Sequence, residues 1–423
     1  MAAEYDVIVV GAGPAGSSCA GLLSKKGVKT LLLDKASFPR DKTCGDEISE
    51  KCIEIIRELG AEEEIKKSQH SRIYGLAASS PSGTLIESRQ SVFQQYICRR
   101  EIFDNILFQL AKKKTDTVEN FTVTDVIMDG NKVVGVKGVK DGKEQEFRAK
   151  VIVGADGANS VVAKKLGLSG FDAGKSHVAI RAYYENVDAD PEQMQVHFLS
   201  ECMPGYFWIF PVGDNVSNVG LGMLASEIQN RRLNLKLLFE RAVKTSRLAP
   251  RFKNAKQVSE VKGWNLPTGA QKRKRAGDGF VLVGDAASII DPLTGGGIGN
   301  AMISSKIAAG IIEEALKKND LSYAMLKEYE KAVDKAFEKE FMERYTLMRL
   351  GQNKLVVDAA FEIMGEDEGI GDSVLKGMMA GGSLLKLRAK IYLRFLPRLA
   401  KNMLKNKIGG HHTTKVPAAT HAP

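Results

Sequence analysis

Three glycines near the start of the chain have the spacing of a dinucleotide-binding turn. Residues 11–16 read Gly-Ala-Gly-Pro-Ala-Gly and follow an apolar run, residues 5–10, that predicts a buried strand. Gly11 permits a tight turn, Gly13 lets the backbone approach a diphosphate, and Gly16 allows a helix to pack closely on the strand. This spacing favours recognition of a diphosphate by the N-terminus of a helix.

An acidic residue follows at the position where such a site binds a ribose. A helix-compatible stretch ends at Gly27, and a second apolar strand, residues 29–33, leads to Asp34. A carboxylate there can accept hydrogen bonds from ribose hydroxyls, which favours FAD or NAD over NADP. The alternative is a glycine turn in an α/β protein that binds no nucleotide, and the ordered succession of strand, turn, helix, strand and acid disfavours it.

A second set of residues could form an apolar binding wall. Tyr206, Trp208 and Phe210 alternate along a predicted strand, so their side chains share one face. Such a face suits a polyisoprenoid chain, and the alternative is ordinary sheet core. The isolated Cys44 is likewise either a small buried hydrophobe or a group beside the reacting atoms.

Two later strands end in short polar turns. Residues 151–157 form a strand that ends in Ala-Asp-Gly, and residues 279–285 form one that ends in Gly-Asp. A glycine-rich segment, residues 291–300, then leads into a helix from about Ala301. Together with the N-terminal turn, these motifs resemble the FAD-dependent oxidoreductases built like para-hydroxybenzoate hydroxylase. The resemblance implies FAD as the cofactor.

The same resemblance implies where the cofactor lies. Asp285 would bind the ribityl chain, Arg100 would lie near the cofactor, and Val123 would contact the adenine through its backbone. The glycine turn would present backbone N–H groups to the pyrimidine edge of the flavin, where the reduced ring carries negative charge. The expected FAD-binding residues are Gly11, Gly13, Ala15, Gly16, Asp34, Lys35, Arg40, Cys44, Gly45, Arg100, Val123, Asp285, Gly295, Gly296, Gly297 and Ile298.

Two further segments indicate which branch of these flavoproteins the chain resembles. Residues 38–46 read Phe-Pro-Arg-Asp-Lys-Thr-Cys-Gly-Asp, and residues 205–222 contain Tyr-x-Trp-x-Phe-Pro followed by Gly-x-Gly. Both are similar to the geranylgeranyl reductase family, which hydrogenates prenyl chains with reduced FAD. The similarity implies Cys44 and Tyr206 as groups that place or relay a proton. The substrate-binding residues that it implies are Tyr206, Trp208, Phe210, Pro211, Gly220 and Gly222.

The motifs of other flavoproteins of this fold match the residues of this chain less well. Halogenases tend to show Ile-Gly-Glu where residues 44–46 read Cys-Gly-Asp, and hydroxylases usually have Arg and His where this chain has Ala163 and Ser288. A monooxygenase or halogenase, or a flavoprotein that passes electrons to a membrane quinone, stays as an alternative. Only one dinucleotide turn is present, so we expect an external electron donor such as NAD(P)H or ferredoxin.

The charge of the chain is concentrated near its C-terminus. The 423 residues carry a formal net charge of +10, and ten basic but no acidic residues follow Asp372. The remainder is neutral overall, which argues against nucleic-acid binding. Residues 384–405 show an apolar stripe opposite a basic one, with Pro397 inside. This pattern predicts an amphipathic helix on an anionic membrane surface, and the alternative is a helix that packs on the body.

Cysteine and histidine usage indicates neither a disulfide framework nor a metal site. The five cysteines include no Cys-x-x-Cys pair, and the six histidines are scattered. No apolar run approaches the ~20 residues that span a bilayer, and we recognise no signal peptide. We expect a cytoplasmic, peripherally membrane-associated monomer.

The elements that must position these residues predict an α/β fold. A Rossmann-like FAD-binding domain carries an inserted antiparallel-sheet substrate domain, and a C-terminal helical region follows. The expected activity is FAD-dependent saturation of carbon–carbon double bonds of a polyprenyl chain on a lipid-like substrate. The predicted FAD domain is 1–75, 96–175 and 265–330, the substrate domain 76–95 and 176–264, the helical region 331–410, and the disordered tail 411–423.

Overall fold

The computed structural model describes residues 4–93, 95–380, 395, 397 and 398. Its first sheet has eight strands in the order β18-β19-β11-β1-β2-β8, with β10 joining β11 to β9. The pairs of β1 with β2 and β11, of β2 with β8, and of β11 with β19 are parallel. The strands are β1 (Tyr5–Val10), β2 (Thr30–Leu33), β8 (Asp116–Val118), β9 (Thr122–Asp129), β10 (Lys132–Lys140), β11 (Lys143–Gly154), β18 (Ala276–Gly277) and β19 (Phe280–Leu282).

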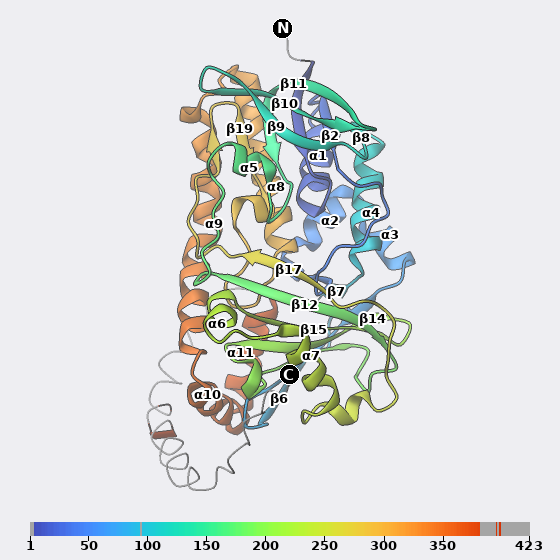
Figure 1. Cartoon of the computed structure of the whole chain (residues 1–423), viewed down its shortest axis with the longest axis vertical. Coiled ribbons are helices and arrows are strands. Elements are labelled where there is room, and N and C mark those ends of the chain that lie inside the picture. The colour runs from blue at the N-terminus through green and yellow to red at the C-terminus, as the bar shows by residue number, and fades with distance from the viewer. Residues whose placement is uncertain (1–3, 94, 381–394, 396, 399–423) are drawn as a thin grey trace, which may run out of the picture.

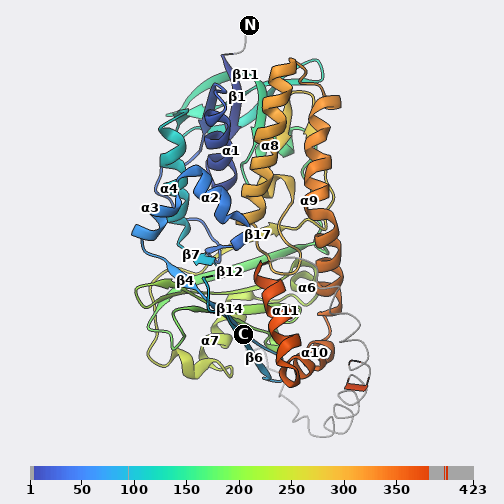
Figure 2. The ribbon, with the colours of Figure 1, turned by 180° about the vertical axis from the view of Figure 1, so that it is seen from behind.

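Long helices cover one face of this sheet (Figure 2). Helix α1 (Pro14–Lys25) contacts both α4 (Arg100–Lys112) and α8 (Ile298–Lys318), and α8 contacts α9 (Tyr323–Leu350). Proline at the first position of α1 suits a helix start because its missing N–H would have no partner there. The parallel strands are buried on both faces, which explains their continuous apolar runs.

The second sheet has the order β16-β12-β15-β14-β13-β5-β6, with β17 also pairing with β12. It lies below the first sheet in Figure 1. All its pairs are antiparallel except that of β13 with β5. The strands are β5 (Gly75–Ser79), β6 (Leu85–Arg89), β12 (Ser176–Glu185), β13 (Gln193–His197), β14 (Gly205–Gly213), β15 (Val216–Leu224), β16 (Lys256–Gln257) and β17 (Lys262–Pro267).

Smaller elements complete the body. A three-stranded sheet has the order β3 (Glu47–Ile48), β7 (Gln95–Ile97) and β4 (Ser71–Ile73). The short helices are α2 (Ile53–Leu59), α3 (Glu62–Lys67), α5 (Val161–Lys165), α6 (Ala225–Asn230) and α7 (Leu235–Lys244). The 3-10 turns are η1 (Glu50–Cys52), η2 (Ser200–Cys202), η3 (Ala249–Phe252) and η4 (Gly284–Ala287).

Helices α10 (Lys354–Glu366) and α11 (Glu368–Ala380) follow α9 and pack against β6. The fold class predicted from the sequence is confirmed. Four of the predicted domain boundaries fall inside elements that continue unbroken through them: 75/76 in β5, 95/96 in β7, 264/265 in β17 and 330/331 in α9. The predicted basic helix 384–405 and tail 411–423 lie outside the described residues, apart from residues 395, 397 and 398.

Candidate active site

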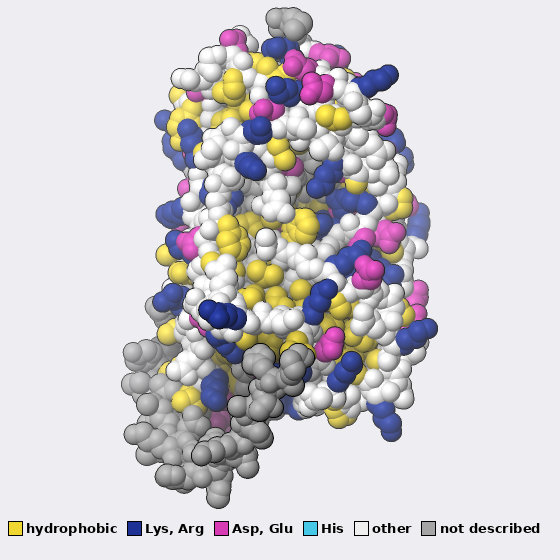
Figure 3. Space-filling view, in the orientation of Figure 1, with side chains coloured by type: hydrophobic (Ala, Val, Ile, Leu, Met, Phe, Trp, Pro, Cys, Tyr) yellow, Lys and Arg dark blue, Asp and Glu magenta, His cyan; other side chains and the backbone are white. Residues whose placement is uncertain are grey.

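A cavity of about 660 Å³ lies where the two large sheets meet. Its walls include Val10, Leu33 and Ala155 at the carboxyl ends of parallel strands, and Ala179 and Arg181 on β12 of the second sheet. Ligands of open α/β sheets bind outside these carboxyl ends. The molecular surface is hollowed near its middle, where hydrophobic side chains gather (Figure 3).

Most of the predicted site residues meet in this cavity. Three of them, Gly16, Pro211 and Gly220, do not line it. Pro211 follows the alternating aromatic residues and so points to the opposite face of β14. The predicted residues that line the cavity are Gly11, Gly13, Ala15, Asp34, Lys35, Arg40, Cys44, Gly45, Arg100, Val123, Tyr206, Trp208, Phe210, Gly222, Asp285, Gly295, Gly296, Gly297 and Ile298.

The turn before α1 has no room for side chains. Gly11 has φ +97°, and a Cβ there would lie 2.5 Å from the carbonyl oxygen of Ala155. A Cβ on Gly16 would lie 1.7 Å from the Gly11 oxygen, so this glycine serves close packing. Asp34 holds the turn, because its carboxylate accepts the Ala12 N–H at 2.7 Å. These are the features that a dinucleotide-binding turn requires.

Two arginines face the start of α1. The Arg100 guanidinium donates to both oxygens of Asp104, at 2.6 and 2.8 Å, and Arg40 forms an ion pair with the same carboxylate at 2.9 Å. A Cβ on Gly13 would lie 3.5 Å from Arg40 and 3.9 Å from Arg100, so both guanidinium groups border the glycine that approaches a diphosphate. Gly13, Arg40, Arg100 and the N-terminus of α1 form a cationic cradle, and this cradle fits the diphosphate of FAD.

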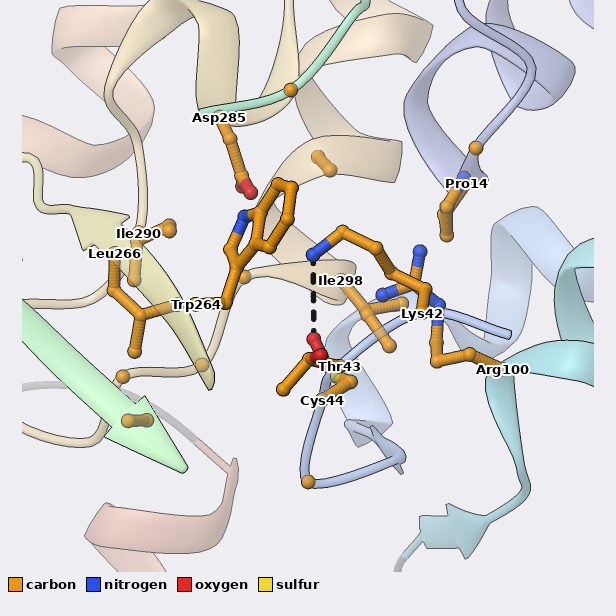
Figure 4. Close-up of a pocket in the computed structure, with 18 of the residues that line it drawn as sticks. Pro14, Lys42, Thr43, Cys44, Arg100, Trp264, Leu266, Asp285, Ile290 and Ile298 are labelled. Carbon is orange, nitrogen blue, oxygen red and sulfur yellow. Dashed lines mark hydrogen bonds between the residues drawn. The ribbon is translucent and has the colours of Figure 1, made fainter. Parts of the chain in front are cut away.

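A lysine and a tryptophan that the sequence analysis missed also line the cavity, and Lys42 lies next to Arg100 (Figure 4). The Lys42 ammonium is 3.7 Å from the centre of the Trp264 ring and donates to the Thr43 carbonyl at 3.3 Å (Figure 4). Burial, together with nearby Arg100, lowers the pKa of Lys42 to about 8. Lys42 lies two residues before Cys44 in a segment already recognised, whereas no local pattern marks Trp264.

The Gly-Asp strand end and the glycine turn also line the cavity. Asp285 points into the cavity beside Trp264 in Figure 4, and burial raises the pKa of its carboxyl. Gly297 caps the start of α8, whose first residue Ile298 lines the cavity. A helix N-terminus here suits the negative charge of a reduced flavin.

The three aromatic side chains predicted to share one face of a strand do pack against one another. Tyr206, Trp208 and Phe210 follow one another at ring-centre distances of 5.9 and 6.1 Å. Trp208 pairs in register with Gly220, and a Cβ on that glycine would lie 2.0 Å from the indole. The Gly-x-Gly motif therefore makes room for the tryptophan. Gly220 contacts the Trp208 indole but does not itself line the cavity.

Asn218, which the sequence analysis did not predict as a site residue, fastens the loop that carries Cys44 to this wall. Its amide nitrogen donates to the Cys44 carbonyl and to Asp46, both at 2.7 Å, and its oxygen accepts the Trp208 N–H at 2.9 Å. Tyr183 donates to the same Asp46 carboxylate at 2.6 Å. No sequence spacing links these residues, because they come from three separate segments.

Two salt bridges of Asp41 also hold the loop that carries Cys44. Asp41 accepts from Arg181 at 2.6 Å and from Lys262 at 2.9 Å. The lysine starts β17 and the arginine lies on β12, so the loop is bonded to both strands. Charged pairs of this kind fix geometry when one partner is buried, as Arg181 is.

Neither predicted proton-relay residue is a strong acid. Burial raises the pKa of the Cys44 thiol despite the opposing charge of Arg100. Burial, followed by Glu47 and Asp291, raises the pKa of Tyr206 well above its usual value, and its hydroxyl donates to the Thr294 carbonyl. Both groups line the cavity and stay protonated at neutral pH. Among the described residues, no cluster of His, Cys, Asp or Glu could hold a metal ion.

Comparison with known proteins agrees with this geometry. Residues 4–339 match the FAD binding domain family. The fold resembles a geranylgeranyl bacteriochlorophyll reductase-like protein of Thermoplasma acidophilum, with a TM-score of 0.80, 27% identity and coverage of 95% of this chain and 98% of that one. A flavin-dependent brominase at 22% identity and TM-score 0.72, over 96% of this chain and 99% of that one, shares the fold. The chain is thus an FAD-dependent oxidoreductase.

Sequence relatives define the family more closely. The chain is 32% identical to the digeranylgeranylglycerophospholipid reductase of Picrophilus torridus, over 82% of this chain and 87% of the relative. It is 35% identical to the reductase of the same name from Methanosarcina acetivorans, over 77% and 80%. The chain belongs to this geranylgeranyl reductase family, as the sequence motifs predicted.

Proposed function

We propose that this protein saturates carbon–carbon double bonds in the geranylgeranyl chains of a glycerophospholipid. The observation that carries the proposal is the aromatic wall of Tyr206, Trp208 and Phe210, which continues the cavity from the FAD cradle. Bound FAD, once reduced, supplies a hydride. Membership of the digeranylgeranylglycerophospholipid reductase family supports the choice of lipid.

The chain's own residues orient the alkene and exclude water. The aromatic rings offer a continuous apolar surface, which suits an isoprenoid and excludes water around the reacting carbons. The Cys44 loop is fixed to this surface through Asn218. We propose that Cys44 and Tyr206 border the reacting bond and orient it.

The reaction requires electrons from outside the chain. Only one dinucleotide turn occurs in the sequence, so we propose that a separate donor, such as NAD(P)H or ferredoxin, reduces the bound FAD between turnovers. The protein is proposed to act as a monomer, because the cavity is built from a single chain.

We also propose that the basic C-terminal segment attaches the protein to anionic lipid. The described helices include none that could cross a membrane. Ten basic residues follow Asp372, and each could contribute ~1 kcal/mol near an anionic surface. Arg398 forms an ion pair with Glu366 on α10, so part of the segment contacts the body. Truncation of residues 383–423 should abolish salt-sensitive liposome binding, whereas unchanged binding would contradict the attachment.

Anaerobic turnover tests the proposed function. Dithionite-reduced protein, supplied with a geranylgeranyl glycerophospholipid under argon, should give products heavier by units of two hydrogens. A strict oxygen requirement would instead indicate a monooxygenase or halogenase. Quinone reduction without any change in lipid mass would indicate an electron-transferring flavoprotein.

A further inference from the structure

A carboxyl group that the account above leaves unused lies at the edge of the substrate cavity. Glu47 begins β3 and pairs through its backbone with Ile97 of β7. Its side chain lines the large cavity, together with Tyr206 and Gly296. It also lines a neighbouring cavity of about 30 Å³, which lies between β3 and α8 and has room for about one water molecule.

The cations around Glu47 are already paired with other carboxylates. Arg344 of α9 donates to Asp291 at 2.6 Å and contacts Glu340 at 2.9 Å, and Lys51 bonds the same Glu340 at 2.8 Å. Asp291 also accepts two backbone N–H groups of its own turn through its other oxygen, so both of its oxygens have partners. The Glu47 side chain forms no hydrogen bond or ion pair with any residue that the structure describes.

These surroundings favour the protonated form of Glu47. Burial, and after it the charge of Asp291, raises the pKa of the carboxyl to about 7, while Arg344 and Lys51 oppose the shift. An acid with this pKa is half protonated near neutral pH and transfers protons efficiently there. The titratable or charged groups that face Glu47 from the elements around it are Cys52 and Lys51 of η1, Asp291 of the glycine turn, Tyr206 of β14 and Arg344 of α9.

We propose that Glu47 is the acid that protonates the alkene, an assignment that rests on the proposed function. The Glu47 O–H bond breaks and a new C–H bond forms at one alkene carbon. The hydride of reduced FAD forms the second C–H bond, so two electrons leave the cofactor and the π bond is consumed. Glu47 is left as a carboxylate, and a proton taken up from solvent and passed on by a water molecule in the small cavity restores the acid.

Glu47 fits this role better than the two residues that the sequence suggested. Thiols and phenols are weaker acids than carboxyl groups, and burial weakens Cys44 and Tyr206 further. All three line the same cavity. Cys44 and Tyr206 then act as positioning residues, and the proton comes from the carboxyl.

Replacing Glu47 by glutamine tests the assignment. Glu47→Gln keeps the shape but removes the acid, so we expect normal FAD content and a rate of alkene saturation lower by about 10²–10⁴-fold. Glu50→Gln is the matched control, because Glu50 is exposed three residues away. Glu47→Asp should retain more activity than Glu47→Gln, and acetate should partly rescue Glu47→Ala.

Infrared spectroscopy gives a readout that does not depend on turnover. The difference spectrum between the wild type and Glu47→Gln should contain a carboxylic-acid C=O band that disappears as the pH rises through about 7. Wild-type rates in Glu47→Gln, or a difference spectrum without this band, would overturn the assignment while leaving the proposed function intact. A wild type that saturates no alkene would refute both.

Discussion

At the scale of single residues, Arg100 contributes most to the cofactor site. It shares the fully buried Asp104 with Arg40 and borders the glycine that approaches the diphosphate. The resemblance to FAD-dependent oxidoreductases implied a place for Arg100 near the cofactor. Lys42, Trp264 and Asn218 could not be predicted, because each acquires its role through partners from distant segments.

Replacing Arg100 by methionine should reduce both stability and FAD retention. The substitution removes two charge-assisted hydrogen bonds to Asp104, which keeps its ion pair with Arg40, so the free energy of unfolding should fall by about 1–3 kcal/mol. Urea denaturation and the flavin-to-protein absorbance ratio after gel filtration measure the two effects. Lys113→Met, at an exposed site just after α4, is the control. Full flavin retention in Arg100→Met would contradict a diphosphate cradle.

Substitutions at Cys44 test whether its side chain contributes to turnover beyond packing. Cys44→Ala and Cys44→Ser should bind FAD normally, because the loop backbone is held by Asn218. We expect turnover to fall ~10-fold or more as the alkene loses a defined contact beside the flavin. Steady-state rates and flavin spectra measure this. Turnover equal to that of the wild type would show that Cys44 only packs.

At the scale of elements, the sequence predicted the segments whose constraints are local. The strand, glycine turn and helix at residues 5–25 follow from apolar runs and from glycines that have no space for a side chain. The purpose of the Gly-x-Gly motif was not predictable, because Gly220 and Trp208 become neighbours only through the pairing of β14 with β15. A register is a property of two strands, and neither strand alone reveals it.

This pairing predicts different outcomes for two neighbouring glycines. A Cβ at position 220 would lie 2.0 Å from the Trp208 indole, so Gly220→Ala should displace the ring and lower the free energy of unfolding by about 1–3 kcal/mol. A Cβ at position 222 would make only ordinary contacts at 3.7 Å, so Gly222→Ala is the matched control. Chemical denaturation compares them. Equal stability of the two variants would show that the indole does not need this space.

At the scale of the whole molecule, the second sheet carries a buried histidine that links stability to pH. His197 is 2% exposed, and burial, with Arg251 and Arg247 after it, lowers its pKa to about 3. Unfolding frees the imidazole to bind a proton below about pH 6.5. The free energy of unfolding should therefore fall with decreasing pH, by up to about 1.4 kcal/mol per pH unit from this group.

Replacing His197 by glutamine should make that acid slope shallower. Denaturation curves between pH 7 and pH 4 measure it, and His70→Asn serves as a control at a partly exposed histidine. An unchanged slope in His197→Gln would mean that His197 is already protonated in the folded protein.

The arrangement of the two sheets was predictable only in outline. The order of the FAD motifs along the chain predicted the fold class and the cofactor, because each motif is a contiguous segment. The shape of the cavity between the sheets depends on contacts between residues far apart in sequence, such as Arg181 with Asp41. The domain boundaries stay a prediction, and four of them fall inside β5, β7, β17 and α9, whose full extents the local sequence did not reveal.

Lipid mass spectrometry tests the central claim most directly, by comparing a host that makes geranylgeranyl lipids with and without this gene. If the protein saturates prenyl chains, the lipids of the strain with the gene will be heavier in steps of two hydrogens, and Glu47→Gln will suppress the shift. Identical lipid masses in both strains, with the protein expressed and loaded with FAD, would contradict the account.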